Sequence, residues 1–431
     1  MRYHLTTLGC AKNVADSERI TRELRGHEPT DAPEAADVLI VNTCGFIDAA
    51  KQESIDAILS LAAGRRPEQR LVVAGCLTAL WREDLARAIP EIDATFGVEA
   101  WSAIASYVDA LEPAGRRARY HLPDPPAAAG PSAYLKIADG CNAPCTFCII
   151  PKMKGFLHSR PPGELAEEAR RLAEAGVKEI VLVAQDTTEY GRDLGMRDAL
   201  PDLLERLTEA APGVHWFRLM YAYPGHVSER LARTMASLPQ VCHYIDIPLQ
   251  HGSPAVLRRM KRPSNLDRVR EMLDMLRSFM PDIALRTTFI TGFPGETEAE
   301  FEELLAFVAE QRFDRVGAFT FSPQPFTPAG GMPDQVPERV KRRRRDRLMR
   351  LAADISRERQ AAQVGRELNV LVERVRPDGS LLGRSYRDAP EVDGAVFLRG
   401  GARPGDLVRA RITAASVYDL AGEALAPAAA R

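Results

Sequence analysis

The chain has 431 residues, 45% of them hydrophobic and 27% charged, and its formal net charge is -2 at pH 7. This length predicts two or three domains with a large core, and the near-neutral charge excludes a general electrostatic attraction to nucleic acid. No apolar stretch approaches the roughly 18 residues of a membrane-spanning helix, and no signal peptide precedes the first predicted strand. Seven cysteines, an odd number, favour metal ligation or catalysis over a disulfide framework, so we expect a cytoplasmic protein without a membrane partner.

The first 111 residues alternate short apolar runs with amphipathic helical stretches. The apolar runs are Tyr3–Leu8, Val38–Val41 and Leu71–Ala74. This alternation predicts a parallel sheet with crossover helices, and we expect residues 1–111 to form one α/β domain.

A cysteine follows each of these three strands: Cys10, Cys44 and Cys76. Because the carboxyl ends of parallel strands lie along one edge of a sheet, these thiols can meet in space although they are far apart in sequence. Buried cysteines also serve as small hydrophobic residues, which is the plainer interpretation of any one of them. Three at equivalent strand ends favour a shared metal site of three thiolates.

Residues 112–131 are rich in proline, alanine, glycine and arginine, which predicts a semi-rigid linker. From residue 132 to residue 363 strands alternate with helices, which predicts a partial (β/α) barrel of about six units. The expected strands are Tyr134–Ala138, Ile180–Ala184, His215–Tyr221, Tyr244–Ile247, Ala284–Thr291 and Val316–Phe321, and helices include Glu164–Ala175, Asn265–Phe279 and Glu298–Gln311.

Three further cysteines lie on one short loop after the first strand of this barrel: Cys141, Cys145 and Cys148. Three thiolates can hold three irons of a four-iron cluster and leave the fourth iron open to a substrate or cofactor, which indicates an enzyme. Structural zinc is the alternative, but such sites usually close with a fourth ligand. The nearest histidines, His121 and His158, do not stand at zinc-ribbon spacing.

The arginine-rich stretch 338–350 can hold nucleic acid, or it can be the solvated face of an amphipathic helix that closes the barrel. Apolar side chains interspersed among the arginines favour the closing helix. They are Val340, Leu348, Met349 and Leu351. Cys242 lies in an apolar stretch of the barrel and is interpreted as packing, not ligation.

From residue 364 to residue 431 the pattern changes to short β runs separated by Pro-Asp-Gly and Gly-Gly turns, which predicts a small all-β barrel. The runs are Leu368–Glu373, Leu381–Ser385, Ala395–Leu398 and Leu407–Ala414. The segment 388–394 is locally acidic, which disfavours a nucleic-acid backbone and suits a basic protein partner.

The spacing of the Cys141 loop resembles the signature of the radical S-adenosylmethionine (SAM) enzymes, in which SAM chelates the open iron. Together with Leu8-Gly-Cys10-Ala-Lys-Asn, Asn42-Thr-Cys44-Gly-Phe-Ile-Asp and Ala74-Gly-Cys76-Leu-Thr, it resembles the methylthiotransferases over nearly the whole chain. The resemblance implies one 4Fe-4S cluster on each cysteine triplet. The implied fold is an N-terminal parallel α/β domain, a partial (β/α)6 radical SAM barrel and a C-terminal all-β TRAM barrel.

Two activities are open within this family: methylthiolation of adenosine in tRNA, and methylthiolation of an aspartate β-carbon in small-subunit ribosomal protein S-twelve. The second is favoured above all by Arg384-Ser-Tyr-Arg-Asp-Ala-Pro-Glu-Val-Asp-Gly. Ala11, where a proline is commoner, and Ala143 depart from the pattern without removing a ligand. The resemblance also implies the ribosome, a low-potential electron donor and a sulfur donor as partners. An iron–sulfur electron carrier, or an RNA-binding protein with a structural metal, is the rival class.

A C–H bond beside a carboxylate is too weakly acidic for a side-chain base, so sulfur insertion there needs homolytic hydrogen abstraction. The resemblance implies that SAM and the Cys141 cluster provide it, while the cluster on Cys10, Cys44 and Cys76 presents sulfur. The sequence identifies no catalytic side chain beyond the cluster ligands.

Residues at several predicted strand ends are candidates for binding SAM. Side chains there could bond its polar groups, and the glycines of Thr291-Gly-Phe-Pro-Gly-Glu could let the backbone approach the nucleoside. Each could equally be an ordinary loop or cap residue. Arg286 needs a carboxylate partner inside the barrel, which SAM could supply. The candidates are Gln185, Asp186, Gln250, Arg286, Gly292, Gly295 and Glu296.

Overall fold

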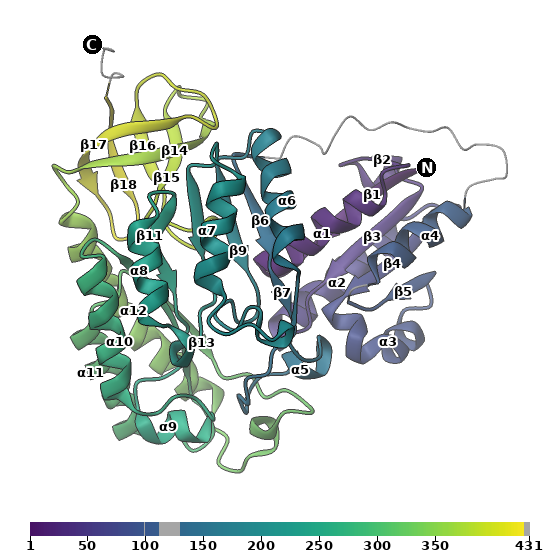
Figure 1. Ribbon diagram of the computed structural model, residues 1–431. Coiled ribbons are helices and arrows are strands. Elements are labelled where there is room, and N and C mark those ends of the chain that lie inside the picture. The colour runs from purple at the N-terminus through teal and green to yellow at the C-terminus, as the bar shows by residue number, and fades with distance from the viewer. Residues whose placement is uncertain (99, 112–129, 426–431) are drawn as a thin grey trace.

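The computed structural model describes residues 1–98, 100–111 and 130–425, which form three bodies that follow one another along the chain (Figure 1). The predicted linker at 112–131 lies outside the described residues except for its last two positions. We retain 1–111, 132–363 and 364–431 as the proposed domain limits. Among the described helices, none is long and apolar enough to cross a membrane.

The N-terminal body is a five-stranded parallel sheet in the order β2-β1-β3-β4-β5, and its three predicted strands are confirmed. Every residue of the central strand β3 is buried, as expected for a strand covered on both faces. Helices α1 and α4 cover one face, and α2 and α3 cover the other. The elements are β1 (Arg2–Thr7), α1 (Ala11–Glu23), β2 (Glu28–Pro29), β3 (Val38–Thr43), α2 (Asp48–Gly64), β4 (Arg70–Gly75), α3 (Cys76–Ala88), β5 (Ala94–Phe96) and α4 (Trp101–Leu111).

The middle body is a six-stranded parallel sheet in the order β13-β12-β11-β10-β9-β6, which confirms the predicted partial barrel of six units. Its strands are β6 (Ser132–Lys136), β9 (Glu179–Val183), β10 (Trp216–Leu219), β11 (Val241–Asp246), β12 (Ala284–Thr291) and β13 (Arg315–Thr320). Helices pack on its outer face: α6 (Pro162–Glu174), α7 (Leu200–Ala210), α8 (Glu229–Ser237), α10 (Leu266–Phe279), α11 (Glu298–Gln311) and α12 (Glu338–Ala361). Shorter elements lie in the connections: β7 (Ala138–Asp139), α5 (Ile150–Met153), β8 (His158–Ser159) and α9 (Pro254–Arg259).

The inner face of this sheet is covered by the other two bodies. Ala11 and Ala15 of α1 pack against it, and so do Leu371 and Ala389 of the C-terminal barrel. Cys242 is buried in the same layer on β11, so the prediction that it packs is confirmed, and burial raises the pKa of its thiol to about 12.

The C-terminal body is a closed five-stranded barrel in the order β14-β15-β16-β18-β17, as the turn-rich β pattern predicts. Its strands are β14 (Glu367–Val375), β15 (Leu381–Ser385), β16 (Val396–Arg399), β17 (Leu407–Ala415) and β18 (Leu420–Ala424). The sequence did not indicate β18, which closes the barrel by pairing parallel to β16 and antiparallel to β17.

The arginine-rich stretch forms α12, and its predicted role as a closing helix is confirmed. Leu348 joins the core of the middle body, and Arg344 is also buried, with its Nη1 2.8 Å from Glu296 Oε1. On the more exposed side, Arg347 pairs with Glu298 of α11 at 2.7 Å. The helix therefore uses part of its positive charge within its own chain.

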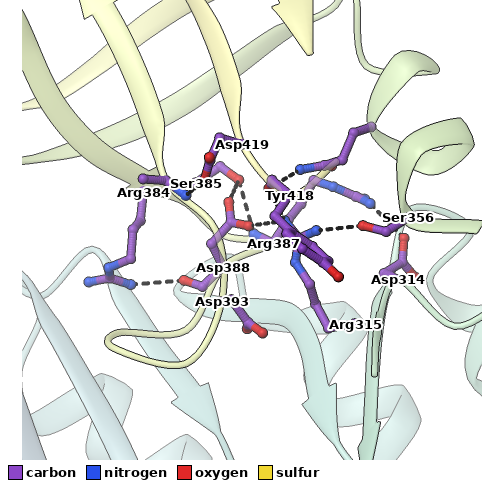
Figure 2. Close-up of polar contacts among 12 residues, drawn as sticks. Asp314, Arg315, Ser356, Arg384, Ser385, Arg387, Asp388, Asp393, Tyr418 and Asp419 are labelled. Carbon is purple, nitrogen blue, oxygen red and sulfur yellow. Dashed lines mark hydrogen bonds and ion pairs between the residues drawn. The ribbon is translucent and has the colours of Figure 1, made fainter. Parts of the chain in front are cut away.

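A buried charge network attaches the C-terminal barrel to the amino end of β13 (Figure 2). Asp388 pairs with Arg315, and Arg387 Nη2 lies 2.6 Å from Asp314 Oδ1. All four side chains are less than 8% exposed, so the attachment is removed from water and each charge depends on its partner.

The prediction that the acidic segment 388–394 suits a basic protein partner is therefore wrong for its two aspartates. The side chains of Asp388 and Asp393 are both 2% exposed, and they face Arg315 and Arg286 of their own chain. Of the three acids in this segment, only Glu391 is exposed. The sequence shows that this segment is acidic, but it does not show whether the acidic side chains point to solvent or into the protein.

The same attachment includes a carboxylate held between two arginines. Glu179, at the start of β9, is fully buried, with its Oε1 2.7 Å from Arg218 Nε and its Oε2 in contact with Arg384. Burial alone would raise the pKa of this carboxyl, but Arg384 and Arg218 outweigh burial and lower it to about 2. Arg218 also donates to the carbonyl oxygen of Tyr386 at 2.6 Å, so β9, β10 and the barrel share one network.

A second buried network joins the N-terminal sheet to the middle body. Asp16 on α1 pairs with Lys136 at the end of β6 and with Lys154, whose Nζ lies 3.2 Å from Asp16 Oδ2. Asp139 contacts the same two lysines at 2.6 and 3.1 Å. The four side chains are only 2–12% exposed. The attraction between opposite charges therefore has to compensate each ion for its lost contact with water.

A smaller contact fixes the N-terminal sheet at a second place. Asp48, at the start of α2, accepts hydrogen bonds from Ser322 at 3.0 Å and from Gln324 at 3.2 Å, both in the loop after β13. Asp16 and Asp48 lie on the helices that follow β1 and β3. The contacts of these two aspartates therefore bring the carboxyl edge of the N-terminal sheet close to the loops after β6 and β13.

Replacing Glu179 by Gln should leave Arg218 and Arg384 without their shared counter-charge and lower the free energy of unfolding by about 3–5 kcal/mol. In the wild type the stabilisation is complete above pH 4.5, the unfolded value, and is lost as the pH falls towards the folded pKa of about 2. Urea denaturation of both proteins at neutral and acidic pH measures this. Glu373→Gln is the matched control, because Glu373 is 29% exposed and pairs with Arg384 at 2.6 Å. If both variants lost the same free energy of unfolding, Glu179 would not be the shared counter-charge of Arg218 and Arg384.

Candidate functional site

The first cysteine triplet lies at the carboxyl edge of the N-terminal sheet. Cys10 caps α1, Cys44 follows β3 and Cys76 begins α3. Gly9 has φ +95°, and a Cβ there would stand 2.7 Å from Cys44 Cβ. Gly75 has φ +98°, and a Cβ there would meet Asn42 Oδ1 at 2.5 Å. Only glycine fits before Cys10 and Cys76: the approach of Cys44 explains Gly9, and the approach of β3 at Asn42 and Thr43 explains Gly75.

The three thiols influence one another electrostatically. Burial raises the pKa of Cys44, and burial raises that of Cys76 to about 12, with Cys10 adding to both shifts. Asn13 lies among them: its amide donates to Leu8 O at 2.7 Å and to Thr43 O at 3.0 Å. The structure thus brings together the three cysteines that the sequence predicts as one site, and deprotonated thiols there would be stabilised by a metal.

The second triplet lies on the loop after β7, which pairs with β8. Gly140 precedes Cys141 with φ +69°, and a Cβ there would stand 2.0 Å from Phe156 O, so this turn also requires glycine. Burial raises the pKa of Cys141 to about 11 and that of Cys148 to about 12, and Cys145 adds to both shifts. These three thiols also form one group.

Two donors point at the sulfurs of the second triplet. The backbone N–H of Ala143 lies 3.4 Å from Cys141 Sγ, and Arg262 Nη1 lies 3.7 Å from Cys145 Sγ. The Arg262 guanidinium also stacks over the ring of Tyr223, 4.2 Å from its centroid. Hydrogen bonds to sulfur are among the features that set the reduction potential of an iron–sulfur cluster.

Within the described ranges, no group of three or more His, Cys, Asp or Glu side chains is arranged to hold a single metal ion. A four-iron cluster places each protein sulfur on a different iron, and three thiolates leave its fourth iron open. The chemistry of each donor set therefore fits such a cluster.

Lys12 lies beside the first triplet, and a packing contact joins the two triplets. Lys12 follows Cys10 by two residues, and Cys76 packs against Ile149, the residue after Cys148. Lys12 Nζ lies 3.5 Å from the centroid of the Tyr221 ring, which follows β10. The two triplets, from different sheets, therefore border the same space.

Of the residues predicted to bind SAM, Gln185 fits a ligand best. Both polar atoms of its side-chain amide are buried and have no hydrogen-bond partner among residues 1–98, 100–111 and 130–425. Buried polar groups are nearly always paired, so an unpaired amide at a strand end indicates a missing partner. Asp186 is already engaged: its carboxylate accepts from Thr188 and lies 3.1 Å from His226 Nδ1. Gln250 has φ +74° and its backbone pairs with Thr288 and Ile290.

Arg286 has the carboxylate partner that was expected, but this partner belongs to the protein. Its Nη1 lies 2.8 Å from Asp246 Oδ1, and its Nε lies 3.5 Å from Asp393 Oδ1 of the C-terminal barrel. Burial would lower the pKa of Arg286, and Asp246 outweighs burial and raises it. Arg286 therefore does not need SAM to compensate its charge.

The glycine loop after β12 also serves the protein's own packing. Gly292 has φ +73°, and a Cβ there would stand 2.2 Å from Lys341 Cγ of α12. Glu296 Oε2 accepts from the backbone N–H of Gly292 at 2.8 Å, while its Oε1 pairs with Arg344. Lys341 therefore excludes a side chain at this position, while an approach of the Gly292 backbone to a nucleoside stays a prediction. Gly295 has φ +71°, and a Cβ there would stand 3.9 Å from Arg259 Nε.

Sequence reasoning missed Lys12, Arg262 and His226. The position of Lys12 beside Cys10 was a usable signal, whereas Arg262 and Cys145 are 117 residues apart and no local spacing connects them. His226 stacks on Tyr223 with a centroid distance of 4.8 Å and lines a cavity of about 690 Å3 beside Asp186. The hydrogen bond to Asp186 raises the pKa of His226.

Three family models match the chain, one on each body. The uncharacterized protein family UPF0004 matches residues 2–97, the radical SAM superfamily matches residues 135–308, and the TRAM domain matches residues 364–425.

Curated relatives match nearly the whole chain. The ribosomal protein uS12 methylthiotransferase RimO of Roseiflexus sp. (strain RS-1) is 49% identical over 98% of this chain and 97% of its own length. The protein of the same name from Chloroflexus aurantiacus is 47% identical, over 99% of this chain and 100% of its own.

Solved structures share the fold at low identity. The radical SAM methyltransferase TsrM from Kitasatospora setae, with cobalamin and a 4Fe-4S cluster bound, gives a TM-score of 0.57 at 13% identity, covering 76% of this chain and 74% of TsrM. The cobalamin-dependent radical SAM enzyme OxsB gives 0.52 at 12% identity, covering 82% of this chain and 56% of OxsB.

The two cysteine triplets thus lie in the parts of the chain that match the first two family models, and identities of 47–49% extend over nearly the full length. This chain belongs to the ribosomal protein uS12 methylthiotransferases, a family of radical SAM enzymes.

Proposed function

We propose that this enzyme transfers a methylthio group to the β-carbon of an aspartate in ribosomal protein uS12. The names of its relatives support this substrate, and the site supports the reaction. A reaction that activates a C–H bond and also inserts sulfur needs two open metal centres beside one substrate, whereas electron transfer needs only closed clusters. The observation that carries the proposal is that two thiol triplets from different sheets meet, with Cys76 of one packed against Ile149, the residue after Cys148 of the other.

The residues present fit two iron–sulfur clusters and SAM. The unpaired amide of Gln185 is the best candidate for a polar contact to SAM. When bound, the SAM-loaded cluster supplies hydrogen abstraction and the other cluster supplies sulfur. The second triplet would hold the SAM-loaded cluster, and the first triplet would hold the cluster that supplies sulfur.

The protein's own groups set the geometry around these centres. Ala143 and Arg262 donate towards sulfurs of the second triplet, and so restrict their positions. The Asp16–Lys154 contact fixes the distance between the two triplets, because one partner follows Cys10 and the other follows the Cys141 loop. Buried contacts on this side also keep water from the space where the substrate carbon reacts.

The proposal requires three partners besides SAM. These are uS12, on the ribosome or free, a low-potential electron donor and a sulfur donor. It also places the protein in the cytoplasm, where uS12 is assembled.

Anaerobically reconstituted enzyme, given SAM, a reductant and sulfide, should add one methylthio group to an aspartate of uS12 and none to tRNA. Mass spectrometry of the digested products tests this. If adenosine in tRNA were modified instead, the substrate would be tRNA and the proposal that it is uS12 would be wrong. An enzyme that does not cleave SAM with either substrate would be an electron carrier.

Iron analysis tests whether the first triplet holds a cluster. Wild-type protein should carry about eight irons per chain, and the triple variant Cys10→Ala, Cys44→Ala, Cys76→Ala should carry about four. Because the other triplet is intact, this variant should still cleave SAM in the presence of reductant. Cys242→Ala is the matched control and should keep the full iron load. A triple variant with unchanged iron would show that these cysteines hold none.

Asp16→Asn tests the joint between the sheets. The change weakens the contacts of Lys136 and Lys154 to α1, so the two triplets should lose their fixed separation. Misplacing reacting groups by about 1 Å can cost on the order of 100-fold in rate. We expect methylthiolation to fall about 10- to 100-fold while SAM cleavage stays within about twofold. Asp56→Asn, at an exposed carboxylate of α2, is the control. If Asp16→Asn lowered methylthiolation and SAM cleavage equally, Asp16 would not act by positioning the two triplets.

A further inference from the structure

We propose that Lys12 binds the side-chain carboxylate of the target aspartate and thereby holds its β-carbon between the two cysteine triplets. This inference rests on the proposed function, because an aspartate substrate is what brings a carboxylate to this space.

The position of Lys12 is the first argument. It follows Cys10 by two residues on the first turn of α1, and Cys76 of the same triplet packs against Ile149, the residue after Cys148. Lys12 Nζ lies over the Tyr221 ring, 3.5 Å from the centroid, so the aromatic face holds the ammonium without neutralising it. A cation therefore stands where both triplets can be reached.

The second argument is that, in the part of the chain described, Lys12 has no carboxylate partner. The neighbouring Lys154 is compensated by Asp16 and Asp139. Asp246, the acid that interacts with Lys12, pairs with Arg286 through its Oδ1 at 2.8 Å. Its Oδ2 accepts from the backbone N–H of Tyr221 at 3.4 Å. A buried or partly buried ammonium without a counter-ion is costly, and a ligand carboxylate would compensate it.

The chemistry of the proposed substrate completes the argument. In an aspartate the carboxylate is attached directly to the β-carbon, so a contact to the carboxylate fixes the carbon that must react. Charge-assisted hydrogen bonds to a carboxylate are short and directional. An adenine base carries no such group and would gain nothing from Lys12. The cation would therefore contribute to the choice of substrate class as well as to the geometry.

A different role is conceivable on charge alone, because Lys12 could simply offset the negative charge of the cysteine thiolates. That role would change the iron content or the reduction potential of the clusters. It would not make the enzyme distinguish an aspartate from an asparagine in the same protein.

A binding cycle separates the two roles. The target aspartate is first located by mass spectrometry of wild-type product, and uS12 is then prepared with that residue as Asp or Asn. Affinity for each is measured by calorimetry with iron-loaded wild type, Lys12→Met and Lys12→Arg. We expect wild type to prefer the Asp form by about tenfold, Lys12→Arg to keep most of this preference, and Lys12→Met to bind both forms alike. Lys51→Met is the matched control, because Lys51 lies over Trp81 at 4.5 Å but pairs with Asp48.

Three results would overturn the inference. They are equal binding of Asp and Asn forms by wild type, an undiminished preference in Lys12→Met, and the same loss of preference in Lys51→Met. The first needs no variant, so the test holds even if Lys12→Met does not assemble its clusters. Failure of the proposed function is a separate result, because wild type would then form no methylthioaspartate at all.

Discussion

Four buried charges hold the two parts of the proposed catalytic centre together. Asp16 comes from the N-terminal sheet, while Lys136, Asp139 and Lys154 come from the middle body, and none of them is more than 12% exposed. In a medium of low polarity such charges are stable only when they remain in contact, so the network specifies one relative position of the two sheets. Each cysteine triplet belongs to a different sheet, and therefore no local turn or helix can set the separation between them. The interface sets it.

The C-terminal barrel is part of the same assembly. Its Leu371 and Ala389 fill the inner face of the six-stranded sheet, while Asp388 and Arg387 anchor it at the amino end of β13. Through Asp393 it also reaches Arg286, which in turn binds Asp246 close to Tyr221 and Lys12. The barrel is therefore connected to the residues beside Lys12 through Asp393, Arg286 and Asp246.

Much of the fold could be predicted because apolar runs and turn residues report local structure. The strand Ala284–Thr291 and the helix Glu298–Gln311 were predicted to the residue. The gathering of Cys10, Cys44 and Cys76 also followed, because strand direction places them at one edge. What could not be predicted depends on packing between distant segments. The partner of Arg286, the filling of the Gly292 turn by Lys341 and the inward direction of Asp388 are all set by elements far away in sequence.

Electron paramagnetic resonance on the fully reduced enzyme tests most directly whether two clusters share one space. Two neighbouring reduced 4Fe-4S clusters should interact magnetically, which gives a broadened or split signal with fast relaxation. The signal should become that of an isolated cluster when Cys10, Cys44 and Cys76 are replaced together. A wild-type spectrum equal to the sum of two independent clusters, or one that shows a single cluster, would contradict a catalytic space bounded by both triplets.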